Sequence, residues 1–117
     1  MNEILNELTT VEELDRALSE SAEHPVLLFK HSLTCPISSR AYREFQTYLV
    51  SADSRVAYKL ITVQTAREVS GSAAEKLGVT HQSPQAILVH NGASVWAASH
   101  YDITSESLQE AIREFVN

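Results

Sequence analysis

The stretch FKHSLTCPISSRAYREF, which runs from Phe29 to Phe45, contains the only cysteine of the 117-residue chain. Cys35 is followed directly by Pro36, and Ser38 comes three residues after the cysteine. A short apolar run leads into this stretch, and apolar residues at helical spacing follow the proline. The pattern predicts a strand, a short loop and a helix, with Cys35 at the start of the helix.

Pro36 is the residue that places Cys35 at the helix start, because proline suits the first helical turn, where its missing N–H removes no hydrogen bond. The sulfur of Cys35 would then face unpaired amides and the positive end of the helix dipole, and both favour a thiolate over a thiol. One interpretation is therefore a reactive cysteine, and the other is a small buried side chain without chemistry. The strand-to-helix position favours reactivity, because α/β folds bind ligands at the carboxyl ends of parallel strands.

The rest of the chain predicts alternating helices and strands. The segment TVEELDRALSE starts with Thr10 and has Glu13 three residues later, which is the pattern of a capping box at a helix start. Gly78 is suited to end a helix, and Asn91-Gly92 is a strong signal for a hairpin between two strands. Helices are expected over residues 11–20, 36–50, 66–77 or 70–77, and 105–116, and strands over residues 25–30, 55–63, 85–90 and 93–100.

This order of elements predicts the fold class. Strands that are separated by helices pair in parallel with right-handed crossovers, and the hairpin adds an antiparallel pair. The expected architecture is one α/β domain over residues 1–117, with a mixed sheet of four to five strands flanked by helices. The fifth strand would come from residues 4–8.

Composition and charge argue against several functional classes. The formal net charge is −6 and the nine basic residues form no Lys- or Arg-rich block, so a nucleic-acid partner is not expected. No apolar run approaches the ~20 residues that span a bilayer, and the first residues lack the basic start of a secretory signal. One cysteine cannot form an internal disulfide, so we expect a cytoplasmic location. Five scattered histidines show no spacing typical of a metal site.

Three segments together resemble the thioredoxin superfamily, and more narrowly the bacilliredoxins of the monothiol type. They are TCPIS at residues 34–38, QSPQAILV at residues 82–89 and NGASVWAASHYDIT at residues 91–104. The likeness extends from the first predicted helix to the last. It implies a thioredoxin-like fold, thiol–disulfide exchange, and bacillithiol as the low-molecular-weight thiol partner.

The resemblance also implies roles for individual residues. Cys35 matches the nucleophile, and Ser38 occupies the place where dithiol relatives carry a second, resolving cysteine. Pro84 matches the cis-proline that faces the active-site cysteine, and Ser83 before it would offer backbone groups to an extended thiol ligand. The alternative for Ser83-Pro84 is an ordinary turn that opens a strand. Without a second thiol in the chain, another molecule must supply the resolving sulfur.

Other residues close to Cys35 in sequence are weaker candidates for the site. Ser38 either donates a hydrogen bond to the thiolate or is simply a polar residue of the first helical turn. His31 is interpreted as a loop residue, with an acid or base role as the alternative. Lys30, His31 and Arg40 are candidates to favour the thiolate or to hold ligand carboxylates. Lys30 alternates with Phe29 along the strand, so its amine is expected to be solvated.

The function expected from these observations is a cytoplasmic thiol–disulfide oxidoreductase that removes bacillithiol from S-bacillithiolated client proteins through a mixed disulfide on Cys35. Client proteins and a low-molecular-weight thiol are the implied partners, and no membrane partner is expected. Bacillithiol is a co-substrate, and no metal or organic cofactor is expected because sulfur-to-sulfur exchange needs none. Two alternatives stay open, namely a thioredoxin-like Fe–S cluster carrier and a thioredoxin-fold interaction domain without catalytic activity.

Overall fold

The elements of the fold follow the predicted alternation of helices and strands, as seen in a computed structural model that describes residues 4–116. Each predicted helix and strand is present, with ends that differ from the expected ones by a residue or two. A short 3-10 helix, η1, was not predicted. In chain order the elements are β1 (Leu5–Glu7), α1 (Val11–Glu20), β2 (Val26–His31), α2 (Pro36–Leu49), β3 (Ala57–Thr62), α3 (Arg67–Leu77), β4 (Gln85–His90), β5 (Ala93–Ser99), η1 (His100–Asp102) and α4 (Ser105–Phe115).

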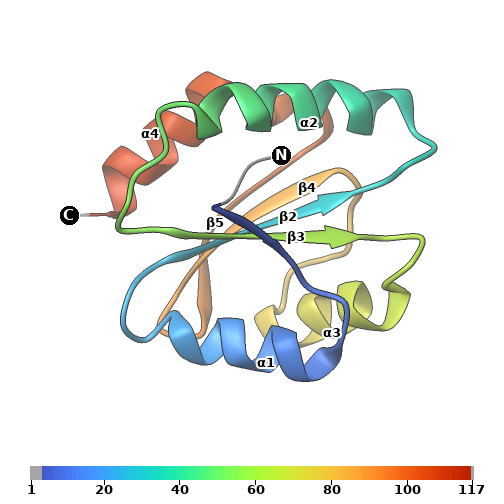
Figure 1. The fold of residues 1–117 in the computed structure, drawn as a ribbon, viewed down its shortest axis with the longest axis vertical. Coiled ribbons are helices and arrows are strands. Elements are labelled where there is room, and N and C mark those ends of the chain that lie inside the picture. Colours follow the sequence, from blue (N-terminus) through green and yellow to red (C-terminus); the bar gives the residue numbers. More distant parts are fainter. Residues whose placement is uncertain (1–3, 117) are drawn as a thin grey trace.

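The sheet has five strands in the order β1-β3-β2-β4-β5. Strands β1, β3 and β2 run parallel, whereas β4 pairs antiparallel with both β2 and β5. Helices α2 and α4 cover one face of the sheet, and α1 and α3 cover the other (Figure 1). The predicted mixed sheet with helices on both faces is confirmed, and β1 confirms the fifth strand.

Local sequence signals explain several boundaries. The amide of Glu13 donates to Oγ1 of Thr10 at 3.1 Å, and the amide of Thr10 donates to Oε1 of Glu13 at 3.2 Å, so the capping box is confirmed. Gly78 ends α3 with a φ of 65°, a conformation that favours glycine. Asn91 and Gly92 both have positive φ, as a tight two-residue hairpin between β4 and β5 requires.

The core consists of two apolar clusters, one on each face of the sheet. Under α2 and α4, the rings of Phe29 and Phe45 stack at 4.6 Å between centroids. The hydroxyls of Tyr48 and Tyr58 form a buried hydrogen bond of 2.7 Å in the same cluster. Each of the long helices therefore buries one side against the sheet, and no helix within residues 4–116 is long and apolar enough to cross a lipid bilayer.

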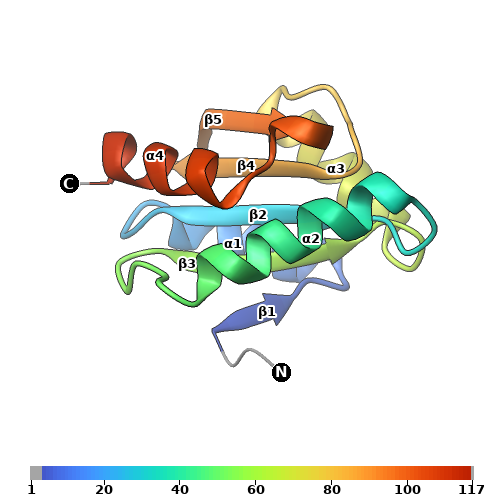
Figure 2. The ribbon, with the colours of Figure 1, turned by 90° about the horizontal axis from the view of Figure 1, so that it is seen from above.

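Strand β2 is the element that positions the cysteine. It lies between β3 and β4, and its residues from Val26 to Lys30 are all buried. In the register of the sheet, Lys30 pairs with Ile61 of β3 and with Gln85 of β4. The chain that leaves β2 therefore starts from the centre of the sheet, at the edge where β3 also ends and β4 begins (Figure 2).

Candidate functional site

Cys35 occupies the N-cap position of α2, as predicted. Residues 32–34 carry the chain from the end of β2 to this helix. Pro36 is the first residue of α2, and the amide of Ser39 donates to the carbonyl oxygen of Cys35, which closes the first turn. The cysteine is free and partly buried. It therefore stands at the positive end of a 14-residue helix, where negative charge is stabilised.

The loop of residues 32–34 is held by Gln64, a residue that was not predicted to belong to the site. Its Oε1 accepts a hydrogen bond from the amide of Leu33 at 3.0 Å. Its Nε2 donates to Oγ of Ser32 at 2.7 Å and to Oγ1 of Thr34 at 3.2 Å. Gln64 follows β3, and β2 and β3 are parallel neighbours, so the two segments that leave them meet at one edge of the sheet. Three hydrogen bonds from one side chain thus shape the path to Cys35.

Ser38 is fully buried and its hydroxyl has two partners within the described residues. The oxygen accepts a hydrogen bond from the amide of Ser32 at 2.8 Å and lies 3.1 Å from Nδ1 of His31. The sulfur of Cys35 is not one of these partners. The structure therefore supports the second predicted role of Ser38, as a polar residue of the first helical turn, over a hydrogen bond to the Cys35 thiolate. Its contacts also join α2 to the end of β2.

His31 is the last residue of β2 and pairs with Thr62 of β3, so its interpretation as a loop residue was wrong. The strand extends one residue further than predicted because this pairing continues to its end. The ring of His31 packs against Tyr42 at 4.6 Å between centroids. Burial lowers the pKa of His31 below its usual value, which favours the neutral ring. A neutral Nδ1 that accepts the Ser38 hydroxyl proton places the ring proton on Nε2.

Lys30 is buried, so the prediction of a solvated amine was wrong. Its exposed fraction is 0%. The amine donates to the carbonyl oxygen of Ser70 at 3.1 Å and lies 3.2 Å from Nδ1 of His81. Both partners lie on the face of α1 and α3, opposite to α2. The side of β2 that alternates with Phe29 is thus covered by helices as well. Burial lowers the pKa of Lys30 from 10.5 to about 8.

The Ser83-Pro84 peptide bond is cis, as predicted. The register of β2 and β4 places Pro84 at the edge of the sheet from which the Cys35 loop departs. Two buried side chains hold the preceding segment: the Lys30 amine contacts His81, and Nε2 of Gln85 donates to the carbonyl oxygen of Thr80 at 3.1 Å. Oγ of Ser83 is buried and has no hydrogen-bond partner within the described residues.

The structure therefore gathers the predicted site residues at one end of the sheet. Cys35, Pro36, Ser38 and His31 lie on the continuous strand, loop and helix of residues 26–49. Ser83 and Pro84 come to the same end on the neighbouring strand β4. Figure 2 shows the start of α2, the segment before β4 and η1 at this end of the molecule.

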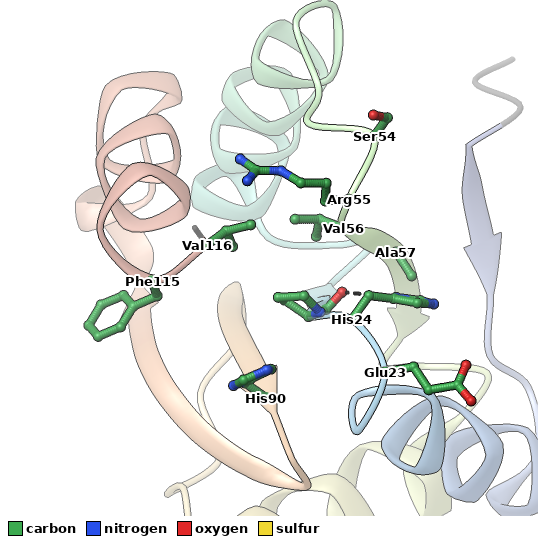
Figure 3. Close-up of a pocket in the computed structure, with 10 residues that line it drawn as sticks. Glu23, His24, Ser54, Arg55, Val56, Ala57, His90, Phe115 and Val116 are labelled. Atoms are coloured by element: carbon green, nitrogen blue, oxygen red, sulfur yellow. Dashed lines mark hydrogen bonds between the residues drawn. The ribbon is translucent and has the colours of Figure 1, made fainter.

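A pocket of about 760 Å³ lies at the opposite end of the sheet, remote from Cys35 (Figure 3). It is placed where β2 and β3 begin and where β4 ends. It is lined by Glu23, His24, Pro25, Ser54, Arg55, Val56, Ala57, His90, Phe115 and Val116. The guanidinium group of Arg55, one of these lining residues, is already paired, because it lies 2.7 Å from the carboxylate of Asp53.

No group of three or more His, Cys, Asp or Glu side chains that could hold a metal ion occurs within residues 4–116.

Comparisons with known proteins place this architecture in a family. A family model described as monothiol bacilliredoxin BrxC matches residues 6–108. A solved structure described as a proposed oxidoreductase with a thioredoxin fold is 34% identical, with a TM-score of 0.81, and the match covers 92% of this chain and 93% of the other.

More distant solved structures share the fold alone. Thioredoxin from Fasciola hepatica is 16% identical, with a TM-score of 0.74 and coverage of 93% of this chain and 97% of its own. Oxidised thioredoxin O2 from Arabidopsis thaliana is 14% identical, with a TM-score of 0.77 and coverage of 100% and 98%. Since the family match includes the strand, loop and helix that present Cys35, the chain belongs to the monothiol bacilliredoxin family and has the thioredoxin fold.

Proposed function

We propose that this protein is a cytoplasmic thiol–disulfide oxidoreductase that removes bacillithiol from S-bacillithiolated proteins. The observation that carries the proposal is the family match over residues 6–108, which includes a lone cysteine at the N-cap of α2. A thiolate is the nucleophile of thiol–disulfide exchange, and a helix N-terminus stabilises its charge. The chemistry needs no metal or organic cofactor, because the bonds that change are all between sulfur atoms.

The first step exchanges one disulfide for another. The thiolate of Cys35 attacks the bacillithiol sulfur on the capped client, so that the client disulfide breaks and a disulfide between Cys35 and bacillithiol forms. The client cysteine leaves as a thiolate, which equilibrates with its protonated form in water. No net oxidation or reduction has occurred at this point, because one disulfide has replaced another.

The second step returns Cys35 to its starting state. A second bacillithiol thiolate attacks the bacillithiol sulfur of the adduct, which releases the Cys35 thiolate and forms bacillithiol disulfide. Over the two steps the client sulfur is reduced and the sulfur of the incoming bacillithiol is oxidised to the same extent, while the sulfur of the cap stays in a disulfide throughout. Ser38 stands where a resolving cysteine would be, and its hydroxyl is bound to Ser32 and His31. The adduct should therefore persist until a thiol arrives from outside.

Neighbouring residues are proposed to orient the exchange. In-line attack requires the three sulfur atoms to align, so the ligand must be held against the helix start. Ser83 and Pro84 are at the same end of the sheet as Cys35, and we expect the backbone of Ser83 to align the extended thiol ligand. We expect His31 and Pro36 to support the geometry of the Cys35 loop.

The test is the release of one model protein that is capped in separate samples with bacillithiol, glutathione or coenzyme A. Free client thiol is measured after addition of the protein together with the same reduced thiol that forms the cap. Release above the rate seen with the reduced thiol alone should be fastest from the bacillithiol-capped client, and the Cys35→Ala variant should add nothing to that rate. Equal accelerations for all three caps would contradict the choice of bacillithiol, and no acceleration with any cap would contradict the oxidoreductase function.

A further inference from the structure

Arg40 and Tyr101 form a cation–π pair between two different elements. The guanidinium carbon of Arg40, in the second turn of α2, lies 5.3 Å from the centre of the Tyr101 ring in η1. Tyr101 is 61% exposed, which is unusual for a large aromatic side chain in this protein. The guanidinium lies over the ring, and this contact does not use its N–H donors.

The charge of Arg40 is not neutralised by the protein. Within residues 4–116, ion pairs join other residues, and Arg40 takes part in none of them. Glu44, one helical turn later, is the natural partner for Arg40 on the helix surface. Its Oε1 instead accepts a hydrogen bond from the amide of Ser105 at 2.8 Å, at the start of α4. The guanidinium is therefore held in place by an aromatic ring and left without a carboxylate.

The pair lies at the same end of the sheet as the proposed reaction site. Arg40 is five residues after Cys35, about 7.5 Å along the helix axis, and helical side chains lean back toward the N-terminus. Tyr101 follows His100, whose amide donates to the carbonyl oxygen of Pro84 at 3.1 Å. The same pair is thus attached to the helix of Cys35 on one side and to the segment of Pro84 on the other. Figure 2 shows η1 next to the first half of α2 at this end of the sheet.

We propose that Arg40, oriented by Tyr101, binds a carboxylate of the disulfide substrate while Cys35 attacks its sulfur. A planar guanidinium binds a carboxylate through two parallel hydrogen bonds, and a fixed guanidinium loses less conformational freedom on binding than a mobile one. The inference rests on the proposed function for its substrate. Two sources share this chemistry, namely a carboxylate of the low-molecular-weight thiol and an acidic side chain beside the capped cysteine of the client.

The first experiment tests the carboxylate site without any disulfide exchange. Cys35 is alkylated with iodoacetate or with iodoacetamide, two probes that differ in having a carboxylate or an amide. The ratio of the two rates is compared among the wild type, Arg40→Gln and Arg43→Gln. Arg43 is the matched control, because it is an exposed arginine on the same helix and outside the described ion pairs.

The expected result is a specific loss of the preference for iodoacetate. Arg40→Gln should lower the iodoacetate-to-iodoacetamide ratio about three- to fivefold, at the upper end of what an exposed charge pair contributes, whereas Arg43→Gln should change it less than twofold. Tyr101→Leu should lower the ratio in the same direction, since it releases the guanidinium. Equal ratios for the Arg40 and Arg43 variants would overturn the inference, because the preference for iodoacetate would then depend only on the overall charge of the protein.

The second experiment distinguishes the source of the carboxylate. Two client peptides, one with a neutral and one with an acidic residue beside the cysteine, are each capped with 3-mercaptopropionate or with 3-mercaptopropionamide. If the cap supplies the carboxylate, Arg40→Gln slows release from the mercaptopropionate cap on both peptides; if the client supplies it, release slows for the acidic peptide with either cap. Release that is unchanged by Arg40→Gln in all four substrates would overturn the inference. A lack of release by the wild type would contradict the proposed function, while the alkylation ratios would still decide whether Arg40 binds carboxylates.

Discussion

The hydroxyl oxygen of Ser38 lies 3.1 Å from Nδ1 of His31, so this side chain in the first turn of α2 joins the helix to the end of β2. The same oxygen accepts a hydrogen bond from the amide of Ser32, which is also buried. In this protein the serine is therefore a structural part of the loop that presents Cys35, in addition to being unable to form a disulfide.

Ser38→Ala should destabilise the protein, because the amide of Ser32 loses its partner inside the protein. An unpaired buried donor costs about 1–3 kcal/mol, so the free energy of unfolding in denaturant should fall by that amount. Ser39→Ala is the control, since Ser39 is the exposed neighbour in the same helical turn. Similar losses in the two variants would show that the Ser38 contacts do not contribute.

Gln64→Ala should loosen the loop before Cys35 while leaving the sheet intact. The amide of Leu33 loses its acceptor, and a neutral hydrogen bond is worth about 1 kcal/mol, so its hydrogen exchange should become about fivefold faster. Gln64→Glu keeps an acceptor for that amide but loses the two donated bonds, and should show a smaller effect. If Leu33 exchanges at the wild-type rate in Gln64→Ala, the loop is held by other contacts.

The buried amine of Lys30 predicts a pH dependence of stability. The native amine releases its proton near pH 8, whereas an unfolded lysine keeps it up to a pH of about 10.5. Between these values the unfolded chain binds more protons, so the stability contribution of Lys30 should increase as pH rises. The wild type should therefore gain free energy of unfolding relative to Lys30→Met from pH 8 upward, by up to about 1.4 kcal/mol per pH unit.

Chemical denaturation at several pH values measures this difference. Lys76→Met is the matched control, because Lys76 is an exposed lysine that pairs with Asp15 on the surface. The difference in free energy of unfolding between the wild type and Lys76→Met should show no comparable rise above pH 8. A constant difference between the wild type and Lys30→Met across the same range would mean that the amine keeps its ordinary pKa.

The sequence predicted the elements of the fold because their signals are local. The capping box at Thr10, the Asn91-Gly92 hairpin and the end of α3 at Gly78 each depend on a few adjacent residues. The placement of Cys35 by Pro36 belongs to the same class. The structure confirms these features, and none of them depends on a residue that is distant in sequence.

The predictions that were wrong or missing depended on neighbours that are distant in sequence. Lys30 was expected in water because it alternates with Phe29, but β2 is a central strand with helices over both faces. Its partners Ser70 and His81 come from 40 and 51 residues later. Gln64 was missed for the same reason, since a single glutamine after a strand carries no pattern. Its position after a strand parallel to β2 was the one available signal.

Intact-mass spectrometry of the protein with a bacillithiol-capped client, without added thiol, tests the central claim most directly. The wild type should gain the mass of one bacillithiol as the client is freed, and the adduct should disappear when bacillithiol is added. Cys35→Ala should gain no mass and free no client. A wild type that frees its client without ever carrying the adduct, or a Cys35→Ala variant that remains active, would contradict exchange through Cys35.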